Sequence, residues 1–330
     1  MNAALLKRMF RVIHGGSESD IHTLCRVIIE AERKAGHSRI AGDLETILNS
    51  KPKHPQSRPK SLSPLPSSKR DASPLFQEIL QKDLRHQMVL PAEVEMRLSR
   101  IEREFAARKR LANHGLQPSR RILLFGPPGC GKSLGAERLA WNTGLPLLKV
   151  RFDTLLSSFF GETHTNLRKV FDIAEERSCA IFLDECDTLA RTRSERNDVG
   201  EATRITNALL EMLESYRGDG LVIAATNLDS ALDPALIRRF DEVIRVPLPT
   251  TEEIEGVLRM NLSAIRTEKK IVWKALAGEM DGMSCSEVAQ VAWSAAKKAV
   301  LESRKTVKGE DLRHALDETH KRQQWAGDKL

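Results

Sequence analysis

A glycine-rich loop between an apolar stretch and an amphipathic stretch constrains the fold of this chain more than any other feature. The loop reads Gly126-Pro127-Pro128-Gly129-Cys130-Gly131-Lys132-Ser133 and fits the pattern G-x-x-x-x-G-K-[ST]. Residues 121–125 predict a strand before the loop, and residues 133–141 predict a helix after it. In this arrangement the backbone N–H groups point at a polyphosphate. We therefore predict that the loop and the adjoining Leu134 bind a nucleoside triphosphate.

Three side chains of this loop carry specific expectations. Lys132 would reach the β- and γ-phosphates, and the Ser133 hydroxyl would ligate Mg²⁺. Cys130 lies between two glycines close to the helix N-terminus, which lowers a thiol pKa. We expect alkylating agents to inhibit ATP turnover and bound ATP to protect against them.

Apolar strand candidates alternate with helical stretches from about residue 90 onward. The strands are predicted at residues 121–125, 145–152, 180–184, 221–226 and 243–246. This alternation predicts an α/β fold, the parallel sheet with flanking helices of P-loop NTPases. After residue 249 only helices are predicted, at residues 252–265, 271–278, 284–302 and 310–325. They predict a second, all-helical module.

The first 74 residues differ from the rest of the chain. Residues 1–50 predict a small helical module, since their apolar residues recur at helical spacing. Residues 51–74 hold six prolines among Ser and Lys, which is typical of an extended tether. Residues 51–70 carry six Lys/Arg and no acid, so they account for most of the net charge of +7. This indicates a solvated linker, with an electrostatic binding arm as the alternative.

Composition also excludes some classes of protein. No apolar run approaches the roughly 18 residues that span a bilayer, and the amino terminus lacks a secretory segment. The five cysteines form no C-x-x-C pair. We therefore predict a cytoplasmic protein with reduced thiols and no membrane partner.

Two acidic residues follow the predicted strand at residues 180–184. Asp184 and Glu185 end the run Ile-Phe-Leu-Asp-Glu, about 50 residues after the phosphate loop. Asp184 would hold Mg²⁺ through its water shell, and Glu185 would orient the attacking water. Asn227 directly follows another apolar strand and could hydrogen-bond that water, although Asn at a strand end is usually a turn residue. Together these motifs predict hydrolysis of ATP.

With these motifs in place, residues 121–246 resemble an AAA+ ATPase of the AAA subfamily, and residues 251–325 resemble its helical lid. The chain is similar to compact bacterial AAA proteins with a short helical N-terminal domain. The resemblance implies a homo-hexameric ring with ATP at subunit interfaces, with Asn227 as the sensor-1 residue. It also implies that residues 113–116 contact adenine, with a plain loop role for His114 as the alternative. The resulting domains are an N-terminal domain (1–50), a linker (51–74), an AAA+ domain (75–249) and a lid (250–330).

One further segment is interpretable through this resemblance as a pore loop. Phe159-Phe160-Gly161 is similar to the family's aromatic–hydrophobic–glycine motif. In a ring, Phe159 would face the channel and grip an extended polypeptide. The alternative is that both phenylalanines are core residues.

Arg238 and Arg239 lie where the family places arginine fingers, which are worth roughly 10³–10⁵ in rate. The usual Pro-Gly spacer between the two arginines is missing, so either residue could be the finger. The alternative is a surface pair balanced by Asp241 and Glu242. Residues 281–287 resemble the segment that opens a lid helix, without a sensor-2 arginine.

The leading prediction is an ATPase that remodels, unfolds or translocates a protein substrate through a central pore. The chain has neither H-E-x-x-H nor G-x-S-x-G, so any proteolysis would need a separate protease or other effector. A nucleic-acid loader or transposition-type ATPase is one alternative, against which the neutral catalytic module argues. A nucleotide-switched scaffold is another, against which Glu185 argues.

Overall fold

The computed structural model describes residues 74–152, 154, 162–185, 199–227 and 237–327, together with Ile29 and Gly42. By its contacts the chain divides into two units, Met1–Pro64 and Leu65–Leu330. All the elements given below belong to the second unit. The predicted N-terminal domain lies outside the described residues apart from Ile29 and Gly42, and so does the linker apart from Pro74.

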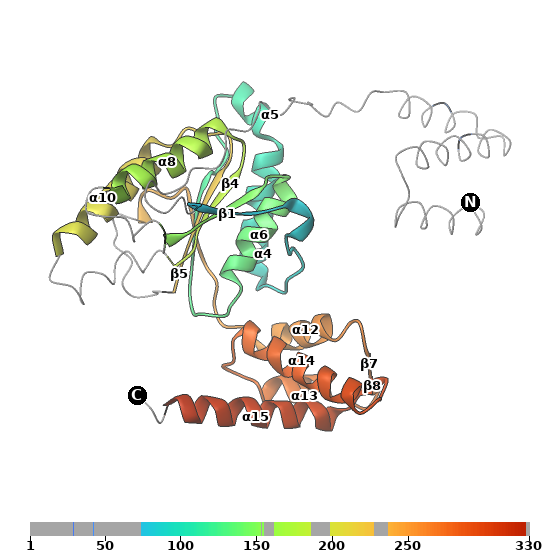
Figure 1. Cartoon of the computed structure of the whole chain (residues 1–330). Helices are drawn as coiled ribbons and strands as arrows, with labels where there is room; N and C mark the ends of the chain where they lie inside the picture. Colours follow the sequence, from blue (N-terminus) through green and yellow to red (C-terminus); the bar gives the residue numbers. More distant parts are fainter. Residues whose placement is uncertain are drawn as a thin grey trace. The chain divides into compact units, whose positions relative to one another are not determined.

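A single sheet forms the centre of the nucleotide-binding module (Figure 1). Its strands are β1 (Phe76–Ile79), β2 (Arg121–Phe125), β3 (Leu147–Val150), β4 (Ala180–Leu183), β5 (Leu221–Thr226) and β6 (Glu242–Arg245). Their order is β1-β3-β4-β5-β2-β6. All neighbours pair in parallel except β1, which is antiparallel to β3. The predicted α/β class and its parallel sheet are therefore confirmed.

The edge strand β1 was not predicted from the sequence. It is short, and its sequence Phe-Gln-Glu-Ile exposes two polar residues while only Phe76 is buried. Such a strand lacks the apolar run of a central parallel strand, so its pairing with β3 decides its conformation.

Helices cover both faces of the sheet, as Figure 1 shows. The helices over one face are α4 (Ala92–Ala106) and α6 (Lys132–Thr143), and those over the other are α8 (Glu162–Glu176) and α10 (Val199–Ser215). The short elements η1 (Gln81–Asp83) and α5 (Arg108–Asn113) follow β1 and α4. Leu123 packs with the second pair, and its neighbours Ile122 and Leu124 pack with the first. Because successive strand residues face opposite ways, a strand covered on both sides is apolar throughout.

The C-terminal module has a separate hydrophobic core. Its helices are α12 (Thr251–Asn261), α13 (Trp273–Gly278), α14 (Cys285–Leu301) and α15 (Gly309–Gly327). The module differs from the all-helical prediction in one respect, because β7 (Arg266–Thr267) pairs in parallel with β8 (Thr306–Val307). Two-residue strands are too short to show a periodicity. Within the described ranges, no helix combines the length and apolarity that crossing a membrane requires.

Candidate nucleotide-binding site

The phosphate loop connects the end of β2 to the start of α6, as predicted. Gly126 has a φ of 139°, and a Cβ there would lie 2.2 Å from the Val246 carbonyl oxygen. Gly129 has a φ of 74°, and its Cβ would lie 2.7 Å from Ser284 Oγ. A side chain at either position would add a clash to a strained backbone. The two glycines therefore permit the tight curl of the loop.

Lys132 and Ser133 are the first two residues of α6 and point at different partners. The Lys132 side chain is held by the loop itself, since Nζ donates to the carbonyl oxygens of Gly126 at 2.8 Å and Pro127 at 2.7 Å. Ser133 Oγ donates to Asp184 Oδ2 at 3.2 Å. The two motifs that predict metal binding are thus in contact, although 51 residues separate them.

The acidic residues and Asn227 follow neighbouring strands of the sheet. Asp184 follows β4 and Asn227 follows β5, and parallel neighbours end at the same edge. Glu185 is exposed and has a φ of 53°, a left-handed conformation that non-glycine residues rarely adopt outside functional sites. Its backbone N–H donates to Asp184 Oδ1 at 3.1 Å.

Lys149 is a member of this cluster that the sequence analysis missed. It lies on β3, beside β4, and its Nζ is 2.7 Å from Asp184 Oδ2. A lysine inside the apolar run of a parallel strand could have indicated a buried partner, because such a charge is rarely left unpaired. The Lys149 ammonium therefore balances the charge of Asp184 in this structure.

The oxygens of Ser133 and Asp184 fit a magnesium ion. Mg²⁺ prefers hard oxygen ligands and is usually bound through one or two protein groups together with phosphates and water. In the part of the chain that the structure describes, no three His, Cys, Asp or Glu side chains gather into a metal cage. A hydroxyl and one carboxylate beside a phosphate loop are the donor set expected for a nucleotide-bound Mg²⁺.

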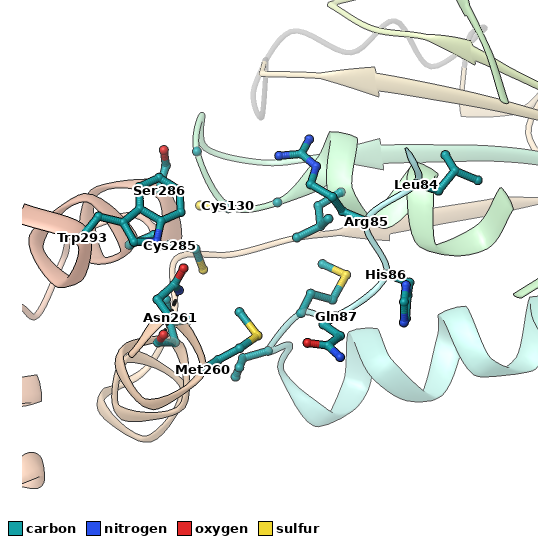
Figure 2. Close-up of a pocket in the computed structure, with 17 residues that line it drawn as sticks. Leu84, Arg85, His86, Gln87, Cys130, Met260, Asn261, Cys285, Ser286 and Trp293 are labelled. Atoms are coloured by element: carbon teal, nitrogen blue, oxygen red, sulfur yellow. Dashed lines mark hydrogen bonds between the residues drawn. The ribbon is translucent and has the colours of Figure 1, made fainter. Parts of the chain in front are cut away.

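A pocket of about 580 Å³ adjoins the phosphate loop (Figure 2). Three parts of the chain line it: residues 84–89, the loop residues 129–131 with Leu134, and side chains from α12 and α14. Most of these side chains are apolar or contain sulfur, which suits the flat face of a base. Residues 113–116, which were expected to contact adenine, do not line the pocket. Residues 84–89 carry no motif, so the sequence analysis did not find them.

The lid helix α14 begins directly at the phosphate loop. Ser284 caps the helix in a capping box with Glu287, whose carboxylate accepts from the Ser284 N–H at 2.7 Å. The next-but-one residue, Ser286, donates its N–H to the Gly129 carbonyl oxygen at 3.0 Å. The lid and the phosphate loop are therefore directly hydrogen-bonded.

The expectation from the sequence that the Cys130 thiol has a lowered pKa was wrong. The residue is 2% exposed, and burial raises its thiol pKa, while the Lys132 charge opposes the shift only in part. Burial likewise raises the pKa of Cys285, which lines the same pocket, to about 11. Desolvation is the largest effect on the Cys130 thiol, and the Glu287 charge adds to it, while the Lys132 charge acts in the opposite direction.

Arg238 and Arg239 lie at a hollow of about 450 Å³. Its lining residues are Gln117, Arg121, Glu214, Arg217, Arg238 and Arg239. Arg239 Nη2 is 3.1 Å from Glu214 Oε2. Arg238 is exposed and makes no ion pair with any residue that the structure describes. The two arginines are thus distinguishable by their surroundings.

The alternative that Asp241 and Glu242 balance the two arginines is contradicted. Asp241 accepts from Arg121 Nη2 at 2.5 Å. Glu242 is buried and accepts from two arginines of α4, Arg97 at 2.7 Å and Arg100 at 2.5 Å. Both carboxylates are engaged elsewhere.

The predicted pore loop, Phe159-Phe160-Gly161, lies outside the described residues, so its interpretation stays a prediction.

The fold and site define a P-loop nucleotide-binding α/β module with a helical lid. A family model, the ATPase family associated with various cellular activities (AAA), matches residues 122–248. The uncharacterized AAA family ATPase y4kL of Sinorhizobium fredii is 36% identical over 307 residues, which cover 93% of this chain and 92% of that protein. This chain belongs to the AAA family and is an ATPase. The proteasome-activating nucleotidase of Archaeoglobus fulgidus is 32% identical over 240 residues, covering 71% of this chain and 60% of that protein.

Proposed function

We propose that this chain is a Mg²⁺-dependent AAA ATPase that acts as a cytoplasmic homo-hexameric ring and remodels, unfolds or translocates a protein substrate through a central pore. One observation carries the catalytic part of this proposal: the hydrogen bond from Ser133 Oγ to Asp184 Oδ2 brings the phosphate loop and the acidic motif together. The adjoining pocket offers an apolar place for adenine while the phosphates lie on the loop.

Each residue of the site has a distinct role in this proposal. Lys132 exchanges its two carbonyl partners for oxygens of the β- and γ-phosphates. Ser133 and Asp184, which lies beside Lys149, would hold Mg²⁺, and the ion would neutralise charge on the phosphates. Glu185 orients the attacking water and takes up its proton. Asn227, one strand away, hydrogen-bonds the same water.

Arg238 is the proposed arginine finger. It is exposed and makes no ion pair with the described residues, whereas Arg239 pairs with Glu214 of α10 in the same chain. A guanidinium that no described residue of its own subunit engages is available to reach the ATP of a neighbour. There it would neutralise charge developing on the transferred phosphoryl group.

The protein substrate is proposed from two parts of the chain that lie almost entirely outside the described residues. Phe159, Phe160 and Gly161 would line the pore and grip an extended polypeptide. Residues 1–50 would recruit the protein substrate, with residues 51–74 as their tether. Residues 250–330 have a separate role and would close over the nucleotide as a lid. The name of the Archaeoglobus relative, a proteasome-activating nucleotidase, supports a role that involves a separate protease.

Substrate trapping with Glu185→Gln tests this function. The variant should bind ATP but lose turnover by about 10²-fold or more, because the water is no longer activated. Light scattering with ATP should then report a hexamer, and mass spectrometry should identify a client protein that the wild-type ring releases on hydrolysis. The same variant with ADP in place of ATP is the control, and it should not retain the client protein. Trapped nucleic acid, or the absence of an oligomer with ATP, would contradict the proposal.

A further inference from the structure

Residues 84–90 are here called the strap, and its residues 84–89 provide one wall of the pocket beside the phosphate loop (Figure 2). The strap has no regular secondary structure, and no backbone–backbone hydrogen bond joins residues 85–90 to the rest of the described chain. Its position therefore depends on side chains. Leu84 and Leu90 pack against the core under α4 and α6, and Val89 packs against the core of the lid.

The first specific anchor joins Arg85 to Glu137 of α6. The Arg85 backbone N–H, Nε and Nη2 all donate to the Glu137 carboxylate, at 2.9, 3.1 and 2.6 Å. The Glu137 side chain is only 9% exposed. A nearly buried carboxylate with three donors from one residue holds both the backbone and the side chain of that residue.

The second anchor is the stack of His86 on Trp141. The ring centroids are 4.2 Å apart and the planes are 8° from parallel. Glu137 and Trp141 lie four residues apart on α6 and therefore share one face of that helix. Two consecutive strap residues are thus attached to two successive turns of one helix, which fixes the direction of the strap as well as its place.

The same helix begins with Lys132 and Ser133 of the phosphate loop. We propose that Glu137 and Trp141 are positioning residues for the nucleotide, which act through the strap by fixing the base-side wall of the pocket relative to the phosphate loop. This inference rests on the proposed binding of ATP in that pocket. A preformed wall lowers the entropic cost of binding, because the residues beside the base do not have to be ordered once the phosphates are on the loop.

Two probes separate positioning from general damage to the site. In the full-length protein, Trp141→Ala should raise the Kd of Mg·ATP about two- to tenfold, the range expected for one aromatic stack. The Kd of magnesium tripolyphosphate, which has no base, should stay the same when both are measured by titration calorimetry. The KM for ATP should rise with the Kd, while kcat changes little. Glu137→Gln should behave in the same way, since it weakens the bonds to Arg85.

The controls lie on the same helix. Trp141→Phe keeps a ring for His86 and should recover most of the ATP affinity, and Asn142→Ala changes an exposed neighbour and should have no effect. Equal weakening of ATP and tripolyphosphate by Trp141→Ala would overturn the inference, because it would mean that the loop itself is damaged. An unchanged Kd for ATP would overturn it as well. A wild-type protein that binds no ATP would instead overturn the proposed function.

Discussion

Cys130 lies two residues before Lys132 inside the phosphate loop, and only 2% of it is exposed. Its thiol is bonded weakly to the Pro128 carbonyl oxygen, at 3.7 Å. At the scale of a single residue, the local sequence and the packed structure favour opposite pKa shifts. The Lys132 charge stabilises a thiolate, but burial removes the water that a thiolate needs, and burial is the larger effect.

We predict that Cys130 is alkylated slowly at neutral pH in the nucleotide-free protein. Only the thiolate reacts, so the labelling rate should rise about tenfold per pH unit up to the raised pKa, above the ordinary value for cysteine. Peptide mass spectrometry after brief treatment with iodoacetamide measures this rate, with free cysteine in the same buffer as the reference. Saturating ATP should slow the labelling further. A rate that is already at its plateau at pH 7 would show a lowered pKa and contradict the structure.

At the scale of elements, the lid depends on the joint between α14 and α15. Asp311, in the first turn of α15, accepts two hydrogen bonds from Arg304, at 2.7 and 2.8 Å, and one from the Lys308 N–H at 2.9 Å. The Asp311 side chain is 6% exposed. The bonds to Arg304 are the main cause that holds its pKa below the usual range. The segment that follows α14 is thereby tied to the start of α15.

Asp311→Ala should lower the free energy of unfolding by about 1–3 kcal/mol at pH 7, because it removes these three hydrogen bonds and takes the acceptor from the Lys308 N–H. The folded pKa of Asp311 is lowered, so its contribution is complete above the ordinary carboxyl pKa and is lost as the pH falls through the folded value. The difference in free energy of unfolding between wild type and variant, measured by urea unfolding, should therefore become smaller only in acid. Asp317→Ala, at an exposed position of the same helix, is the control. A difference in free energy of unfolding that stayed constant into acid would contradict this account.

At the scale of the whole molecule, the acidic residues of the site and Arg238 adjoin different strands of the sheet. Asp184 and Glu185 follow β4, whereas Arg238 precedes the edge strand β6, with β5 and β2 between these strands in the sheet. This separation agrees with an arginine that serves the nucleotide of a neighbouring subunit. The proposed ring is the arrangement in which both sets could act on one ATP.

We predict that Arg238→Ala rings lose turnover by about 10³-fold or more, and that Arg239→Ala rings lose much less. Rings of Glu185→Gln subunits should also be inactive. Mixing the two inactive variants, Arg238→Ala and Glu185→Gln, should restore part of the activity. The reason is that an intact Glu185 in one subunit then meets an intact Arg238 from its neighbour. Phosphate release across a series of mixing ratios measures this recovery.

A mixture that stays as inactive as its components would rule out Arg238 as a finger acting between subunits. Near wild-type turnover by Arg238→Ala would also rule out Arg238 as the arginine finger.

Much of the fold and part of the site could be predicted from the sequence. The strands β2 and β5 have the predicted bounds, since fully buried strands need uninterrupted apolar runs. Ser133 and Asp184 were each predicted to bind Mg²⁺, and their contact agrees with the rule that parallel strands end at one edge of a sheet. β7 and β8 were missed because they are only two residues long, and β1 was missed because it lacks an apolar run and owes its conformation to its pairing with β3.

The sequence by itself determined the phosphate loop, because its glycines and its neighbouring strand and helix are set by local backbone requirements. Only the tertiary structure decided that Lys149 pairs with Asp184, that the strap forms the pocket wall, and that Cys130 is buried enough for its pKa to rise. The physical reason is the same in each case. Contacts between segments far apart in sequence, and the loss of water around a group, arise only when the chain is packed.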